Sequence, residues 1–361
     1  MSLIEQANSN TKREPGKKET SVARAEDDIT ETPNRIRSVG FGGLDTRPKL
    51  CTRNNAHNCA LMLSRRALFA APTLLLPHES PPIPLAAAEA GYVSRTFFDD
   101  FTSIATVDID ETGNTGYKWY KQQFFGADLV PAGDISVANS VLTLNGSVNH
   151  TNTARCRLFT QGYLGGTRTT QGSTFAEGAY FEARFSYDPS LAIPYPRPGW
   201  PAFWAHDRGL LLAQTNLTAY HGAEIDFWEA YPSENGTTSN LMTVHDWTVT
   251  NGTFGTSITN SNNNVGGNLG SPDFTQLNTY GCLWIPASKN GGTGLLQRYF
   301  NGVHVSALDI SYSATGPASP SYAFSPNLDG TLSILDSSNF VVVIEGSFQW
   351  PVSFDYVAVW Q

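Results

Sequence analysis

The stretch from residue 222 to residue 230 reads G-A-E-I-D-F-W-E-A, and it constrains the fold of this chain more than any other. Three carboxylates stand among large apolar side chains, a composition that favours a β-strand. Because strand side chains alternate between two faces, Glu224 and Asp226 point one way and the apolar residues beside them point the other. Strict alternation would then turn Glu229 into the apolar side, where an unpaired charge is costly.

A β-bulge in this strand removes the conflict. One extra residue near Phe227 and Trp228 lets two residues oppose one on the neighbouring strand, which returns Glu229 to the acidic face. The sequence therefore predicts one surface that carries Glu224, Asp226 and Glu229 above an apolar core, with Trp228 facing that core.

Crowded carboxylates give a strand little stability, because like charges repel and one of the groups has its pKa raised. Two carboxyl groups of different pKa are what glycoside hydrolysis uses, one as nucleophile or base and one as proton donor. With the bulge, the Cα atoms of Glu224 and Glu229 lie roughly 13 Å apart, at about 3.3 Å per residue. Side chains that lean together would bring the carboxyl groups to the order of 5–6 Å, which is compatible with a retaining pair, whereas an inverting pair stands roughly 6.5–9.5 Å apart. A solvated acidic strand face is the alternative interpretation of the spacing alone.

The rest of the chain has the composition of an all-β protein. Among 361 residues, 15% are charged, 12% are aromatic and 32 are Gly. From about residue 92 onward, short apolar or alternating stretches are separated by turn-forming residues, and each is predicted as a strand. These stretches are 141–146, 179–185, 241–247, 295–300, 303–305, 340–344 and 354–360, with Asn301-Gly302 as a two-residue hairpin turn. We predict one two-sheet antiparallel β-sandwich (jelly roll) with a concave substrate cleft.

The first ninety residues differ from this pattern. Residues 1–61 are polar, mixed in charge and without periodicity, so we predict a disordered segment. In residues 62–90, Arg65-Arg66 precedes a short apolar run, as in a twin-arginine export signal. The run is too short to span a bilayer, and a buried apolar helix or linker is the alternative. Met62 is a natural start for such a signal, so residues 1–61 are also consistent with a mis-assigned translation start.

Cleavage of this signal is expected after Ala90, where Ala88-Glu89-Ala90 has the small-x-small form of a processing site. Residues 91–361 would then form the catalytic jelly-roll domain. The expected location is secreted or periplasmic, with no stable membrane insertion once the signal is removed.

Charge and cysteine content exclude several classes of partner. The formal charge of −9 argues against nucleic acid, since phosphate binding needs a basic patch. No C-x-x-C and no histidine cluster with metal-ligand spacing occurs, so no metal site is predicted. In residues 91–361 only Cys156 and Cys282 remain, either as one disulfide or as two buried thiols.

Four segments in order resemble one family. The acidic stretch 224–229 resembles the catalytic signature of glycoside hydrolase family 16, the laminarinase-like jelly-roll enzymes. Three further segments agree in type and order with strands of that family: G-A-Y-F-E-A-R at 178–184, G-W-P-A-F-W at 199–204 and D-Y-V-A-V-W-Q at 355–361. The resemblance covers roughly residues 97–361. The two residues between Asp226 and Glu229 resemble the laminarinase branch, whereas many lichenase-type members lack the extra residue.

The resemblance implies roles for the three acids. Glu224 would be the nucleophile and Glu229 the general acid/base, while Asp226 would hydrogen-bond the nucleophile and tune its protonation. No organic cofactor is implied, and the resemblance allows a structural calcium ion without assigning its ligands.

Five further residues are candidates for substrate binding. A sugar ring presents an apolar face, so Trp200 and Trp204 are candidate aromatic platforms, and core aromatics are the alternative. His245 lies on the expected neighbouring strand, where the family often carries a histidine, and a structural histidine is the alternative. Glu182 and Arg184 alternate onto one face and could reach the cleft, or could form a cross-strand ion pair worth little.

The sequence as a whole predicts a secreted retaining endo-glycosidase. Its partner would be a β-linked polysaccharide, with a β-1,3- or mixed-linkage glucan as the leading substrate, and the chain is expected to act as a monomer. A galactan hydrolase and a transglycosylase are the alternatives on the same fold. A non-catalytic, lectin-like carbohydrate-binding module is the alternative from another class, although binding alone has no need of crowded carboxylates. The long Pro-rich insertion at 186–198 and the departure from the family's apolar run at 205–208 weaken any transfer of substrate from the family.

Overall fold

The computed structural model describes residues 80–122, 129–146, 155–163, 170–192, 199–213, 219–232, 238–250, 253–261, 269, 272–306, 309–313, 316–319, 334–347 and 349–361. The chain divides into two units, residues 1–72 and 73–361, and all the described residues belong to the second unit. The predicted disordered segment 1–61 and residues 62–79 of the predicted export signal lie outside the described residues.

Ten strands form one sheet, called the facing sheet below. Its path runs through β18 (Gly316–Ser319), β17 (Ile310–Ser313), β15 (Thr293–Phe300), β14 (Asn278–Ile285), β9 (Ala179–Tyr187), β20 (Val352–Trp360), β5 (Val141–Leu144) and β4 (Ile135–Ala138). Off this path, β1 (Arg95–Asp99) pairs with β20, and β16 (Val303–His304) pairs with β15. Every pairing described in this sheet is antiparallel.

Eight strands form the second sheet, called the acidic sheet because it contains residues 222–230. Its path runs through β13 (Thr253–Ser261), β12 (Thr238–Thr250), β11 (Ala219–Pro232), β10 (Ala202–Asp207), β19 (Phe340–Ser347), β6 (Arg155–Phe159), β3 (Trp119–Tyr120) and β2 (Val107–Asp108). Its pairings are antiparallel except that β2 and β3 run parallel at one edge. A small separate ribbon pairs β7 (Gln161–Tyr163) with β8 (Thr170–Gly172).

The helical elements are all short. They are α2 (Leu85–Glu89), α3 (Arg208–Ala213), α4 (Ile334–Ser337) and the 3-10 turns η1 (Ile104–Thr106), η2 (Ala132–Asp134), η3 (Pro189–Leu191) and η5 (Ala287–Lys289). Among the described residues, no helix has the length and apolarity that crossing a membrane requires.

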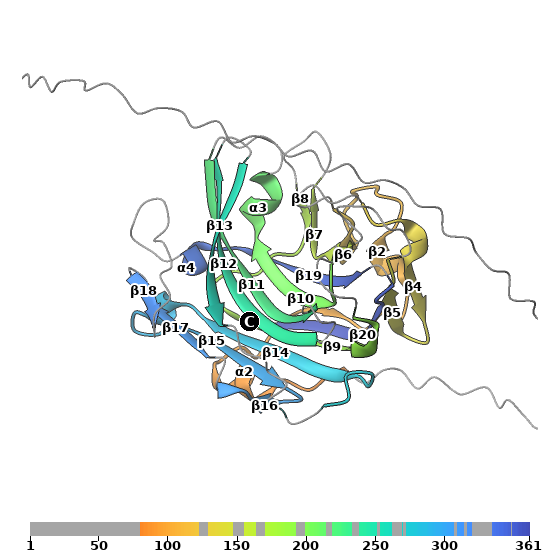
Figure 1. Ribbon diagram of the computed structural model, residues 1–361. Helices are drawn as coiled ribbons and strands as arrows, with labels where there is room; N and C mark the ends of the chain where they lie inside the picture. Colours follow the sequence, from red (N-terminus) through yellow and green to blue (C-terminus); the bar gives the residue numbers. More distant parts are fainter. Residues whose placement is uncertain are drawn as a thin grey trace, which may run out of the picture. The chain divides into compact units, whose positions relative to one another are not determined.

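The two sheets pack face to face around one main apolar core (Figure 1). Phe181 of β9 stacks on Phe227 of β11, with ring centroids 4.7 Å apart and planes inclined by 21°. Trp228 packs on Tyr280 of β14, with centroids 4.6 Å apart. Because these contacts join the inner faces of both sheets, the predicted two-sheet sandwich is confirmed, and so is the inward direction of Trp228.

The register of β11 contains the predicted bulge. Two consecutive residues of β10 pair with Trp228 and Asp226 of β11, so Phe227 is the extra residue. On the other side, the pairing of β11 with β12 is interrupted between Ile225 and Glu229. Since Phe227 and Trp228 are both buried in the core, the bulge predicted from the sequence is confirmed.

The hairpin predicted at Asn301-Gly302 is also present, between β15 and β16. Asn301 and Gly302 have φ angles of 48° and 75°. Positive φ at both central residues is what a type I′ turn requires, and Asn-Gly adopts it at low energetic cost.

Helix α2 covers part of the outer surface of the facing sheet. Ala86 and Ala87 are buried there with Tyr180 and Trp360, which belong to β9 and β20. These alanines belong to the stretch assigned above to the export signal. Cleavage after Ala90 stays a prediction.

Gly346 marks a point where the two sheets approach closely, and it provides a test of the fold. A Cβ atom at Gly346 would lie 2.5 Å from the backbone oxygen of Leu144, which cannot move aside without shifting β5. We expect Gly346→Ala to lower the free energy of unfolding by about 1–3 kcal/mol, measured by chemical denaturation. Gly133→Ala is the matched control, because a Cβ there meets nothing within 4 Å. Equal free energies of unfolding for the two variants would contradict this account.

Candidate active site

Three neighbouring strands bring the acidic residues together. Glu224, Asp226 and Glu229 lie on the outer face of the acidic sheet, because the bulge turns the two aromatic residues between them into the core. Glu224 pairs with His206 of β10 on one side and with His245 of β12 on the other. Glu224 and Asp226 are buried, whereas Glu229 is partly exposed.

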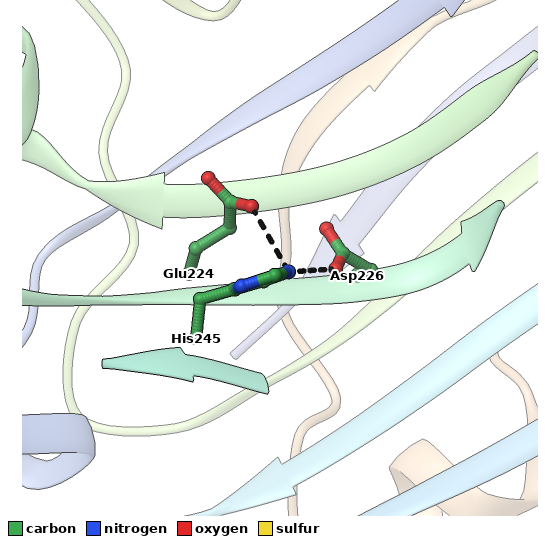
Figure 2. A group of neighbouring side chains, drawn as sticks. All are labelled: Glu224, Asp226 and His245. Carbon is green, nitrogen blue, oxygen red and sulfur yellow. Dashed lines mark hydrogen bonds and ion pairs between the residues drawn. The ribbon is translucent and has the colours of Figure 1, made fainter. Parts of the chain in front are cut away.

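His245 lies between two of the carboxylates (Figure 2). Its Nε2 atom is 3.1 Å from Oδ2 of Asp226 and 3.6 Å from Oε1 of Glu224. The ring also stacks on Trp247, with centroids 5.6 Å apart. The structure therefore brings the predicted histidine to the acidic group.

The charge state of His245 follows from these neighbours. Burial by itself would lower the pKa of the ring, but the charge of Glu224 and the hydrogen bond and charge of Asp226 raise it to about 10. At neutral pH the ring is an imidazolium that places a positive charge among the carboxylates.

Glu229 has a different environment from the other two acids. Trp200 Nε1 donates a hydrogen bond to its Oε1 atom at 2.7 Å. Burial raises the pKa of Glu229 well above its ordinary value, and the charge of Asp226 raises it further, although the bond from Trp200 and the charge of His245 act against this. Glu229 therefore keeps its proton at pH values where an ordinary carboxyl group has lost it.

His206 is the second histidine next to Glu224, and the sequence analysis gave it no role. Burial lowers its pKa to about 3, so the ring is neutral. Its Nδ1 atom lies 2.8 Å from the backbone oxygen of Asp207. A neutral ring has one nitrogen that donates, and a carbonyl oxygen can only accept, so Nδ1 carries the proton. Glu224 thus stands between a neutral and a charged histidine.

Glu224, Asp226 and His245 also form the one group among the described residues whose ligand atoms are close enough for a metal ion. One such atom of each lies within 4.8 Å of the others. A metal would need the lone pair of the imidazole, which is protonated at neutral pH. The imidazolium and a metal ion would therefore compete for the same carboxylates.

Trp204 lies on the same outer face but beneath the surface. It is 5% exposed and packs with apolar residues of β6, β19 and α3, so it cannot offer an open ring face to a sugar. Its Nε1 atom donates to Oε2 of Glu345 at 3.2 Å, and the same oxygen accepts from Nε of Arg157 at 2.8 Å. The side chain of Trp200 is partly exposed and packs edge-on against Tyr231, so Trp200 is the better-placed platform.

Arg157 and Glu345 are residues of this face that no motif in the sequence identifies. They come from β6 and β19, which are distant in sequence from each other and from β11. Glu345 follows an apolar run in which Val341 and Val343 also face outward, so alternation along that run would have placed it on the outer face. Nothing in the sequence alone would have paired it with Arg157.

Glu182 and Arg184 are not brought to the acidic group. They lie on the outer face of the facing sheet, on the far side of the core, because Phe181 and Phe185 of β9 point inward. There they line a cavity of about 470 Å³ beside residues 81–86. Arg184 bonds Asp355 at 2.9 Å. The expectation that the two side chains could reach the cleft was therefore wrong. Alternation predicted that they share one face of the strand, but it could not predict that this face lies away from the acidic sheet.

Cys156 and Cys282 are both buried and form no disulfide. Of the two alternatives given by the sequence, two buried thiols is therefore the correct one. Burial raises the pKa of both thiol groups, which keeps them protonated and unreactive at neutral pH.

The chain is similar to solved structures at low sequence identity. No family model and no curated protein sequence matches it. It is similar to an endo-1,3-beta-glucanase from Streptomyces sioyaensis, with 14% identity, a TM-score of 0.43, and coverage of 74% of this chain and 95% of that one. It is also similar to a beta-1,3-1,4-glucanase (lichenase) derived from a mouse hindgut metagenome, with 12% identity, a TM-score of 0.32, and coverage of 73% and 97%. A third similar structure is the carbohydrate recognition domain of Emp46p, with 10% identity, a TM-score of 0.29, and coverage of 67% and 88%. At identities this low the likeness concerns the fold alone.

The hydrogen bond from Trp200 provides a test of the environment of Glu229. Because this bond lowers the pKa of Glu229, we expect Trp200→Phe to raise that pKa further above its ordinary value. The measurement is a pH titration of the ¹³C-labelled carboxyl carbon by NMR. Trp284→Phe is the control, since it removes an indole donor whose partner is Tyr312 in the facing sheet, and the pKa of Glu229 should stay as in the wild type. A lower pKa in Trp200→Phe would contradict the arrangement described.

The raised pKa of His245 predicts a pH dependence of stability. The folded-state pKa of about 10 lies above the ordinary value of 6.5. The stabilisation of the folded state by the charged ring is therefore fully present below about pH 6.5. It is lost as the pH rises through about 10. Between these values we expect the free energy of unfolding to fall by on the order of 2–4 kcal/mol more in the wild type than in His245→Gln. Denaturant unfolding at stepwise pH measures the difference, and parallel curves for the two proteins would refute the assignment.

Proposed function

We propose that this chain is a retaining endo-glycosidase that hydrolyses a β-linked glucan. The observation that carries the proposal is the contrast between two carboxyl groups on one strand face. Glu229 retains its proton, whereas Glu224 lies beside the imidazolium of His245. A proton donor and an ionised nucleophile on one face are the two groups that glycoside hydrolysis with retention requires.

In the first step, an oxygen of Glu224 attacks the anomeric carbon and forms a glycosyl ester. Glu229 donates its proton to the glycosidic oxygen, and the shortened glycan leaves as an alcohol. Asp226 holds His245 by the bond between Oδ2 and Nε2, which keeps the imidazolium next to Glu224. The positive charge offsets part of the repulsion between the two neighbouring carboxylates.

In the second step, Glu229 acts as a general base instead of a general acid. Its carboxylate takes a proton from water, the water oxygen attacks the anomeric carbon, and the bond to Glu224 breaks. The product has the same anomeric configuration as the substrate, because the carbon is inverted twice. Trp200 donates to Glu229 throughout this cycle and so stabilises the carboxylate form.

The proposed substrate is a neutral glycan. The outer face of β11 carries three acids and the whole chain has a formal charge of −9, which disfavours a polyanionic polysaccharide. Arg157 does not offset this charge, because Glu345 already pairs with it. The choice of a β-1,3- or mixed-linkage glucan, and of internal bonds, rests on the resemblance to glycoside hydrolase family 16.

Two alternatives remain within the same site. A neutral galactan fits the same charge argument, and a transglycosylase would use the same covalent intermediate with a sugar as acceptor in place of water. A lectin-like module is the alternative from another class, but binding alone has no need of a protonated carboxyl group beside two further acids. We also propose export of the protein by a twin-arginine signal, on the sequence alone.

Release of reducing ends by the full chain tests this proposal. The substrates are laminarin, lichenan, agarose, carrageenan and xylan. We expect release from one of the two glucans, none from Glu224→Gln, and a rate that falls by about 10²–10⁴-fold in Glu229→Gln. Proton NMR of the first products reports the anomer and should show retention.

Glu182→Gln is the matched control. It changes a buried glutamate in the same way, but on the outer face of the facing sheet, so the rate should equal that of the wild type. Release from no substrate, with equal binding of one glycan by the wild type and Glu224→Gln, would refute hydrolysis and favour the lectin-like module. Inverted products would refute the covalent step.

A further inference from the structure

A buried arginine lies beneath the acidic strand, between the two sheets. Arg298 belongs to β15 and points inward with Leu296 and Phe300, and it is 1% exposed. Its Nη1 atom is 2.9 Å from Sγ of Cys282 on β14. Its Nη2 atom donates to the backbone oxygen of Asp226 on β11 at 3.3 Å. The guanidinium thus connects the facing sheet to the acidic strand.

Stability alone does not explain a charge in this position. No carboxylate among the described residues pairs with Arg298, and its buried Nε atom has no hydrogen-bond partner there. A buried, incompletely paired charge is costly, and replacing such a group with an apolar side chain is often neutral or stabilising. The thiol of Cys282 is a weak acceptor that offsets little of this cost.

The acceptor on β11 is placed where the strand needs support. Asp226 directly precedes Phe227, the extra residue of the bulge, and the pairing with β12 is interrupted from Ile225 to Glu229. A bulge leaves backbone groups without their usual ladder partners, and an unpaired buried carbonyl destabilises the strand locally. Arg298 supplies a donor to the carbonyl of Asp226 from inside the core.

We propose that Arg298 is a positioning residue that holds the bulge and thereby sets where Glu229 stands relative to Glu224. It touches no substrate, and it acts only through the backbone of β11. Without the bulge, strict alternation would turn Glu229 toward the core and separate the two carboxyl groups. This inference rests on the proposed function for its effect on rate, but its effect on the position of Glu229 is independent of any activity.

Three variants of the full chain test the inference. Arg298→Met keeps an unbranched apolar chain and removes both donors, while Arg298→Lys keeps a charged donor. Leu296→Ala is the matched control, because it weakens the same strand at the same buried face and removes no hydrogen-bond donor to β11. The position of Glu229 is followed by the ¹H–¹⁵N signal of the Trp200 indole, whose N–H donates to Glu229.

We expect Arg298→Met to shift the Trp200 indole signal toward that of a free indole and to lower kcat on the glucan by about tenfold or more, with KM changed less than about twofold. Arg298→Lys should recover part of both effects. Leu296→Ala should lower the thermal midpoint while the indole signal stays in place and kcat stays within about twofold of the wild type, since the bulge is intact.

Two results would overturn the inference. One is an Arg298→Met protein that folds and keeps the wild-type indole signal. The other is a Leu296→Ala protein that shifts the signal equally, because the effect would then be a general loss of packing. If the wild type hydrolyses no glycan, the proposed function fails, and the indole signal in the three variants still decides whether Arg298 positions Glu229.

Discussion

The bulge at Phe227 lets two consecutive aromatic side chains enter the core while the acid that follows them stays outside. Strict alternation would bury only one of Phe227 and Trp228, and with Phe227 inside it would turn Glu229 toward the core. With the bulge, the same nine residues supply both the apolar area that joins the sheets and the carboxyl groups of the outer face. Both the packing of the sandwich and the composition of its outer face therefore depend on one interruption in a hydrogen-bond ladder.

Electrostatic balance on the outer face depends on the two strands beside β11. His245 brings a positive charge from β12, and the protonated state of Glu229 removes a negative one, so the carboxylates of Glu224 and Asp226 face a single imidazolium. His206 on β10 is kept neutral by burial and adds no charge. These five titratable side chains thus include one positive charge, which offsets part of the negative charge of the acids.

Much of this arrangement could be predicted from local sequence. Alternation in residues 222–230 predicted the shared face of the acids, the conflict at Glu229 predicted the bulge, and Asn301-Gly302 predicted a hairpin turn. Local patterns did not predict which surface of the sandwich a strand face belongs to, because that depends on strands distant in sequence. Glu182 shares a face with Arg184 as expected, but only the assembled sandwich shows that this face lies away from the acids.

The same limit applies to pairs that form across the sheets. Nothing near Arg298 in the sequence points to the carbonyl of Asp226, because β11 and β15 belong to different sheets. The segment of Trp204 leaves a sugar platform and a core aromatic as alternatives, and residues of β6, β19 and α3 cover its ring. Such contacts depend on how the chain closes on itself, which short-range periodicity does not encode.

Helix α2 has a consequence for handling and maturation of the protein. Ala86 and Ala87 cover the outward sides of Tyr180, Tyr356 and Trp360. A chain cut at the predicted processing site would lose that cover and present a cluster of aromatic rings to water, a surface that promotes self-association. Recombinant versions that begin upstream of residue 80 would keep the rings covered, so solubility should depend on where the polypeptide is made to start.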